Sequence, residues 1–79
     1  MNKIYENLIE LLNDWFEMYQ EVYYEERELD KCKNLSEANG QWKFVSYINT
    51  NGVDTHVFEN IYLKKLVQIE NYDVIGFFP

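Results

Sequence analysis

Cysteine and histidine are scarce: the 79-residue chain has one of each, Cys32 and His56. A lone cysteine cannot form an internal disulfide, which agrees with a reducing compartment. A closed zinc site needs several clustered cysteine and histidine ligands, and no acidic loop carries the central glycine of a calcium-binding pattern. We therefore expect no metal site.

Glycine is also sparse. The three glycines, Gly40, Gly52 and Gly76, are too far apart to build a loop that cradles phosphate. The net charge of -7 would repel DNA and RNA. The sequence thus predicts neither a cofactor nor direct binding to nucleic acid.

Long apolar runs are missing. The longest covers residues 74–79, far short of the roughly 20 residues that cross a bilayer. Near the N-terminus, Glu6, Glu10 and Asp14 interrupt the stretch in which a signal peptide needs a continuous apolar segment. We expect a protein that does not bind membranes and is located in the cytoplasm.

Catalytic groups are equally few. Any Ser-His-Asp or Cys-His arrangement would have to use His56, whose expected neighbours are Tyr47 and Asp54. No cysteine and no glycine-framed serine lies nearby. Cys32 stands between two lysines that favour its thiolate, and we interpret it as a bystander. We predict that the protein is not an enzyme.

The first third of the chain has the apolar spacing of an amphipathic helix. Two parallel rows of apolar residues alternate steps of four and three: Ile4, Leu8, Leu11, Trp15, Met18 and Val22, then Tyr5, Ile9, Leu12, Phe16, Tyr19 and Tyr23. So wide a stripe suits packing on a sheet better than a coiled-coil seam. The helix is expected to end between Leu29 and Asn34, and residues 36–40 to form a short helical turn closed by a glycine.

From Gln41 onward the apolar period becomes two, as in strands. One expected strand follows Gln41, with Trp42, Phe44 and Ile48 on one face and Lys43, Val45 and Tyr47 on the other. Residues 62–70 fit either a strand or a short helix, and we favour the strand. A turn at residues 70–73 then leads into a last strand at residues 73–78.

The pair Asn51-Gly52 predicts a two-residue type I′ hairpin. Its register follows from the turn. The expected cross-strand pairs are Thr50 with Val53, Ile48 with Thr55, Tyr47 with His56, Ser46 with Val57, and Val45 with Phe58. The predicted fold is therefore α+β, a single domain over residues 1–79 in which a long N-terminal helix packs on a four-stranded antiparallel meander.

Charge is unevenly distributed. Up to Asp30, nine acids meet two bases, whereas from Lys31 onward five acids meet five lysines. The net charge therefore resides in the N-terminal segment, where Glu6, Glu10, Glu17 and Glu21 recur away from the apolar stripe. An acidic helix face of this kind can provide solubility alone, or it can pair with lysines and arginines that normally hold nucleic acid.

Aromatic residues make up 18% of the chain, and seven of them are tyrosines. Most are expected in the core. Helical spacing places Tyr24 off the apolar stripe and among carboxylates, a setting that suits a protein interface.

In its size, acidity and aromatic content the chain resembles the small inhibitor proteins of phages and mobile elements, such as anti-CRISPR, anti-restriction and uracil-glycosylase inhibitor proteins. It is also similar to bacteriocin immunity proteins. The resemblance implies a protein that occupies the nucleic-acid site of an enzyme, with carboxylates standing where phosphates would. If phage-encoded, it would act in the cytoplasm of the host cell.

The leading hypothesis is an acidic inhibitor that acts as a nucleic-acid mimic, binding a basic nucleic-acid-binding protein as a monomer or homodimer. Its expected binding residues are Glu10, Glu17, Glu21, Tyr24, Glu25 and Glu28. The alternatives are an immunity protein to a nuclease toxin and a non-catalytic adaptor. The adaptor would self-associate through an exposed hairpin face containing Val45, Tyr47 and Phe58, or through surplus apolar surface on the helix.

Overall fold

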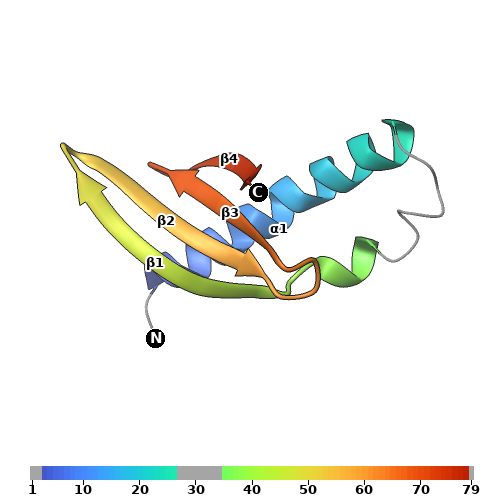
Figure 1. Cartoon of the computed structure of the whole chain (residues 1–79), viewed down its shortest axis with the longest axis horizontal. Coiled ribbons are helices and arrows are strands. Elements are labelled where there is room, and N and C mark those ends of the chain that lie inside the picture. The colour runs from blue at the N-terminus through green and yellow to red at the C-terminus, as the bar shows by residue number, and fades with distance from the viewer. Residues whose placement is uncertain (1–2, 27–34, 79) are drawn as a thin grey trace. The chain divides into compact units, whose positions relative to one another are not determined.

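A computed structural model describes residues 3–26 and 35–78, with side chains for residues 3–21 and 37–78. One helix is followed by a four-stranded antiparallel sheet, which confirms the predicted α+β class (Figure 1). The elements are α1 (Lys3–Glu26), the 3₁₀ turn η1 (Leu35–Ala38), β1 (Trp42–Thr50), β2 (Val53–Asn60), β3 (Lys65–Glu70) and β4 (Asp73–Phe78). They form two compact units, Met1–Gly40 and Gln41–Pro79, which are described separately.

Helix α1 buries the centre of its apolar stripe. Leu8, Leu12 and Phe16 are at most 1% exposed. Four neighbours on the same side are half-buried, namely Ile9, Leu11, Trp15 and Tyr19. Ile4 and Tyr5, in the first turn of the helix, and Met18, at the edge of the stripe, are exposed. The second of the two predicted rows therefore supplies most of the buried face.

The end of the first unit agrees with the prediction from the sequence in the residues that the structure describes. Helix α1 is described as far as Glu26, so its predicted end between Leu29 and Asn34 falls outside the described residues. The predicted turn at residues 36–40 is confirmed as η1, followed by Gly40 with a φ of 84°. That left-handed conformation suits a glycine that terminates a helical turn.

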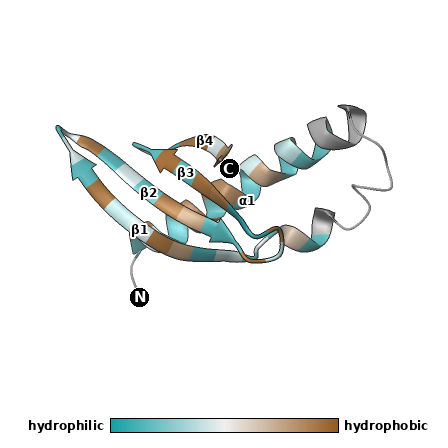
Figure 2. Cartoon of the chain, viewed as in Figure 1, coloured by the Kyte–Doolittle hydropathy of each residue, from teal (hydrophilic) through white to brown (hydrophobic). Residues whose placement is uncertain are grey.

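The sheet is a meander in the order β1-β2-β3-β4. Asn51 and Gly52 have φ values of 53° and 83°, which confirms the predicted type I′ hairpin. Asn71 and Tyr72, with φ values of 47° and 65°, form a second turn with both central residues left-handed, at the predicted position. Hydrophobic and hydrophilic bands alternate along β1 and β2, as expected for strands with two different faces (Figure 2).

The segment that fitted either a strand or a helix contains a turn and then a strand. Residues 61–64 form the turn, and β3 begins at Lys65. Asn60, which is fully buried, organises this connection. Its side-chain oxygen accepts a hydrogen bond from the backbone N–H of Leu63 at 2.9 Å, and its backbone carbonyl accepts one from Lys64 at 2.8 Å.

The β1–β2 register is confirmed near the turn and wrong beyond Ser46. Ser46 pairs with Val57 as predicted. The next residue of β2, Phe58, pairs with Phe44 instead of Val45. Val45 is the extra residue of a β-bulge, where two residues of one strand oppose one of the other. The Phe44 and Phe58 rings meet edge to face, with centroids 5.7 Å apart.

This bulge exchanges the faces of β1. Because side chains alternate along a strand, one inserted residue places Phe44 and Tyr47 on the same face, whereas Ile48 lies on the other. The expected face that combined Trp42, Phe44 and Ile48 is therefore wrong, and Ile48 is 60% exposed.

The prediction for Phe58 is also wrong. It was expected on an exposed hairpin face, yet none of its surface is exposed. It forms the buried centre of the sheet with Val67 and Ile69, which are likewise fully buried, while Trp42 is 7% exposed. The two other members of that predicted face, Val45 and Tyr47, are exposed. Tyr47 remains on the face of Phe58, whereas the bulge removes Val45 from its predicted pairing with Phe58.

Candidate functional site

Five carboxylates form a continuous line on α1. Every one of them is exposed. At 100° per residue they fall within an arc of about 80°, centred roughly 160° around the helix from Leu8, Leu12 and Phe16. We call this line the acidic ridge: Glu6, Glu10, Asp14, Glu17 and Glu21.

The spacing of the ridge can be compared with that of a nucleic acid. At about 1.5 Å per residue, the Cα positions of Glu6 and Glu21 are roughly 22 Å apart along the helix axis. The ridge therefore carries about one charge per 5.5 Å, whereas one strand of B-DNA carries one phosphate per about 3.4 Å. The charges of the ridge therefore lie along a line, as the phosphates of one DNA strand do, but they are more widely spaced.

Within α1 the ridge has little neutralising charge. Lys3 is the one basic residue between Lys3 and Glu26. Neighbouring ridge carboxylates are three or four residues apart, the spacing at which like charges on a helix repel each other. Within α1, the ridge is therefore a strongly negative face.

The predicted binding residues are only partly placed. Glu10, Glu17 and Glu21 lie on the ridge. Tyr24 and Glu25 belong to α1, but their side chains fall outside the described residues, as does the whole of Glu28. The structure extends the described surface with Glu6 and Asp14, whose helical spacing already indicated that they share this face.

A second group of polar side chains lies near the tip of the β1–β2 hairpin. The Tyr47 hydroxyl donates to Asp54 Oδ1 at 2.6 Å, and Asn49 Nδ2 donates to the same oxygen at 2.6 Å. These bonds, that of Tyr47 first, hold the pKa of Asp54 below its ordinary value. The bond to Asp54 in turn raises the pKa of Tyr47. Asp54 is therefore an oriented, ionised carboxylate at neutral pH.

Two hydrogen bonds between Asp54 and Asn71 hold the backbone of this group in place. The backbone N–H of Asp54 donates to Asn71 Oδ1 at 3.0 Å, and the backbone N–H of Asn71 donates to the Asp54 carbonyl at 2.9 Å. The ring centroids of Tyr47 and His56 are 4.6 Å apart, in agreement with the predicted pairing of these two residues. Asn49 and Asp54 were not among the predicted site residues, although the register set by Asn51-Gly52 already places them opposite each other.

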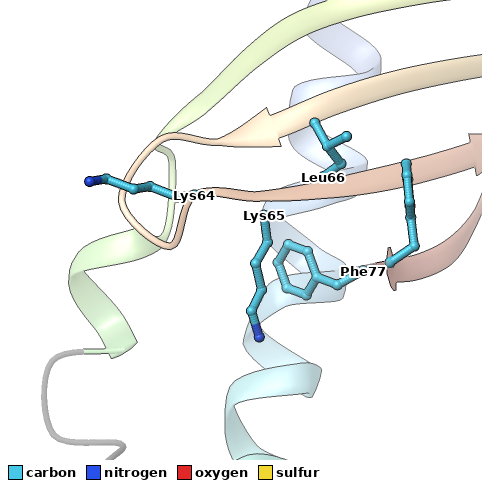
Figure 3. Close-up of a pocket in the computed structure, with 5 residues that line it drawn as sticks. Lys64, Lys65, Leu66 and Phe77 are labelled. Atoms are coloured by element: carbon cyan, nitrogen blue, oxygen red, sulfur yellow. The ribbon is translucent and has the colours of Figure 1, made fainter.

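A hollow of about 590 Å³ lies near the β2–β3 turn and the end of β4. It is lined by Lys64, Lys65, Leu66, Phe77 and Phe78. Figure 3 shows Lys64 extending away from Lys65, which lies beside Phe77. Because the two amino groups diverge, the hollow lacks the convergent polar groups typical of a small-molecule site.

Other classes of site find no support in the described part of the chain. Residues 3–26 and 35–78 contain no group of three or more potential metal ligands. In the same ranges, no helix has the length and apolar content needed to cross a bilayer. Comparisons with protein-family models, with curated proteins and with solved structures find no match.

Proposed function

We propose that this protein is a non-catalytic inhibitor that binds a nucleic-acid-processing protein and covers its basic nucleic-acid-binding surface. The observation that carries the proposal is the acidic ridge: five exposed carboxylates on one face of α1, with Lys3 as the one cation of that helix. Lysine and arginine side chains that hold phosphates are complementary to such a line of charge.

The strength of single ion pairs limits what the ridge can do. An exposed ion pair contributes about 0–1 kcal/mol, so five pairs set the rate and orientation of encounter more than the final affinity. Tight binding also needs apolar anchors. Met18, which is 69% exposed and one helical turn from Asp14, is one such anchor beside the ridge. The predicted contact of Tyr24 would supply another.

Charge reversal on the ridge tests the proposal. The protein is immobilised, partners are captured from a low-salt lysate, and the captured partner is assayed for nucleic-acid binding with and without the inhibitor. Replacing Glu17 and Glu21 together by lysine should weaken binding at least about 100-fold, because both pairs become repulsive. Circular dichroism should show an unchanged fold, since both side chains are exposed.

A matched control separates the ridge from net charge. Glu37→Lys changes the charge by the same amount as Glu17→Lys, at an exposed position outside α1. Binding should survive Glu37→Lys and fall with Glu17→Lys. The proposal is wrong if the two variants behave alike, or if the partner still binds nucleic acid while the inhibitor is bound. A partner that proves to be a nuclease toxin would identify the immunity-protein alternative.

Exposed apolar side chains on the hairpin favour a second candidate, a self-associating adaptor. Val45, Ile48 and Val53 are 47%, 60% and 37% exposed. They would replace the originally expected surface, since Phe58 is buried. Sedimentation of the purified protein distinguishes the candidates: an adaptor of this kind is dimeric without a partner, and Ile48→Ser should dissociate it.

A further inference from the structure

The zero net charge of the C-terminal half of the sequence conceals a separation of charge along the sheet. The strand register places three lysines at one end, where β1 begins and β3 begins, and three acids at the other end, next to the two tight turns. The lysines are Lys43, Lys64 and Lys65, and the acids are Asp54, Glu70 and Asp73. The remaining acid of β2, Glu59, is in register with Lys43.

The acidic end also presents an ordered aromatic and polar surface. Tyr47 is 50% exposed, and its pairing with His56 and that of Asn49 with Asp54 put all four side chains on the same face of the hairpin. We call these four residues the hairpin-end surface. Figure 1 shows that the β1–β2 hairpin extends past the β3–β4 turn, so its tip projects from the sheet.

We infer that the hairpin-end surface binds an arginine side chain of a protein partner. The charge of this end of the sheet favours a cation: Asp54 lies on the surface itself, Glu70 and Asp73 lie at the same end on the opposite face, and no lysine among residues 41–78 lies there. The inference concerns the sheet and does not depend on the acidic ridge.

The geometry favours a guanidinium over an ammonium group. Both hydrogen bonds from Tyr47 and Asn49 end on Asp54 Oδ1, so Oδ2 of the same carboxylate can accept from an incoming donor. A guanidinium is planar, donates several parallel hydrogen bonds and stacks on aromatic rings, whereas an ammonium group is a compact point charge. The half-exposed ring of Tyr47, beside Asp54, provides the stacking partner.

Capped tripeptides test the inference directly. Acetyl-Gly-Arg-Gly-amide and its lysine counterpart are titrated into the ¹⁵N-labelled full chain at low salt, and amide chemical shifts are followed. The arginine peptide should shift the signals of residues 47–56 with a saturable curve. The lysine peptide should bind there at least about threefold more weakly, because it cannot stack.

Two isosteric variants separate specific binding from general attraction. Asp54→Asn keeps an oxygen that can accept from Tyr47 and Asn49 but removes the charge, and it should weaken binding about tenfold. Asp73→Asn removes the same charge from the same end of the sheet and should weaken binding less than threefold. Equal effects of the two variants, equal binding of the two peptides, or shifts confined to α1 would each overturn the inference.

Discussion

Removing charge from the acidic ridge should stabilise the free protein. Four pairs of neighbouring carboxylates lie three or four residues apart along the ridge. The double variant Glu10→Gln, Glu17→Gln breaks all four, because each pair contains one of these two residues. Glutamine and glutamate have similar helix propensities, so the substitution changes charge with little effect on the intrinsic preference for helix.

The expected magnitude follows from the number of pairs. Each like-charge pair at this spacing destabilises a helix by about 0.2–0.5 kcal/mol, so relief of four pairs should raise the free energy of unfolding by about 1–2 kcal/mol. For a domain of this size, that corresponds to a rise in Tm of roughly 4–16 °C. Salt should suppress the gain, because the screening length falls from about 30 Å at 0.01 M to about 3 Å at 1 M.

Urea denaturation followed by circular dichroism at 0.01 M and 1 M salt measures this effect. A control variant, Glu37→Gln with Glu59→Gln, has the same net charge but leaves the ridge intact. It should show no gain, since Glu59 lies opposite Lys43 and its loss removes an attractive pairing. The reasoning fails if the control gains as much as the ridge variant, or if the gain of the ridge variant persists at 1 M salt.

Three further variants test the sheet. Asn60→Ala should lower the free energy of unfolding by about 1–3 kcal/mol in urea denaturation, because the half-buried N–H of Leu63 loses its acceptor. Asn71→Gly removes a similar bond at an exposed turn and tolerates the φ of 47°, so it should change stability by less than about 1 kcal/mol; equal effects would contradict the role of burial. Tyr47→Phe should raise the pKa of Asp54 toward its ordinary value of 3.8 in an NMR titration of its carboxyl carbon, and an unchanged midpoint would contradict the main cause given for the shift. Because folding lowers this pKa, the stabilisation is present above the unfolded-state pKa and is lost as the pH falls through the folded-state pKa.

Turns were the most predictable part of the fold. Asn51-Gly52 carries its conformation in its own two residues, since asparagine and glycine tolerate positive φ. The hairpin register near the turn followed from it without knowledge of the rest of the chain. The helix was predictable for a similar reason, because its apolar period repeats over many turns.

The β-bulge could not be predicted by the same reasoning. Val45 suits either face of a strand, and nothing in its immediate neighbours marks an inserted residue. Its position depends on which rings meet across the strands, and the pairing of Phe44 with Phe58 is a contact between residues 14 positions apart. A local pattern does not contain that information, so every face assignment beyond Ser46 was reversed.

The distribution of charge was also only partly predictable, because a count of charged residues does not give their positions in the fold. Counting residues located the excess of acids in the N-terminal segment, and helical spacing then predicted their common face. From Lys31 onward the count gave zero, because five lysines and five acids cancel, although the register separates those of the sheet along the strands. The hairpin-end surface became visible only when each charge was assigned to an end of a strand.

The energetic cost of the ridge bears on why it exists. Solubility requires charged side chains of both signs distributed over the surface, which avoids repulsion between neighbours. The five acids of the ridge are instead concentrated on one face of α1, at spacings that destabilise the helix by an amount worth about a tenth to a third of the stability of a small domain. A basic partner that binds along the ridge would remove this repulsion, so part of the free energy lost in the free protein returns on binding. That gain applies only to a partner whose cations follow the same line, which is the kind of partner that the proposed function requires.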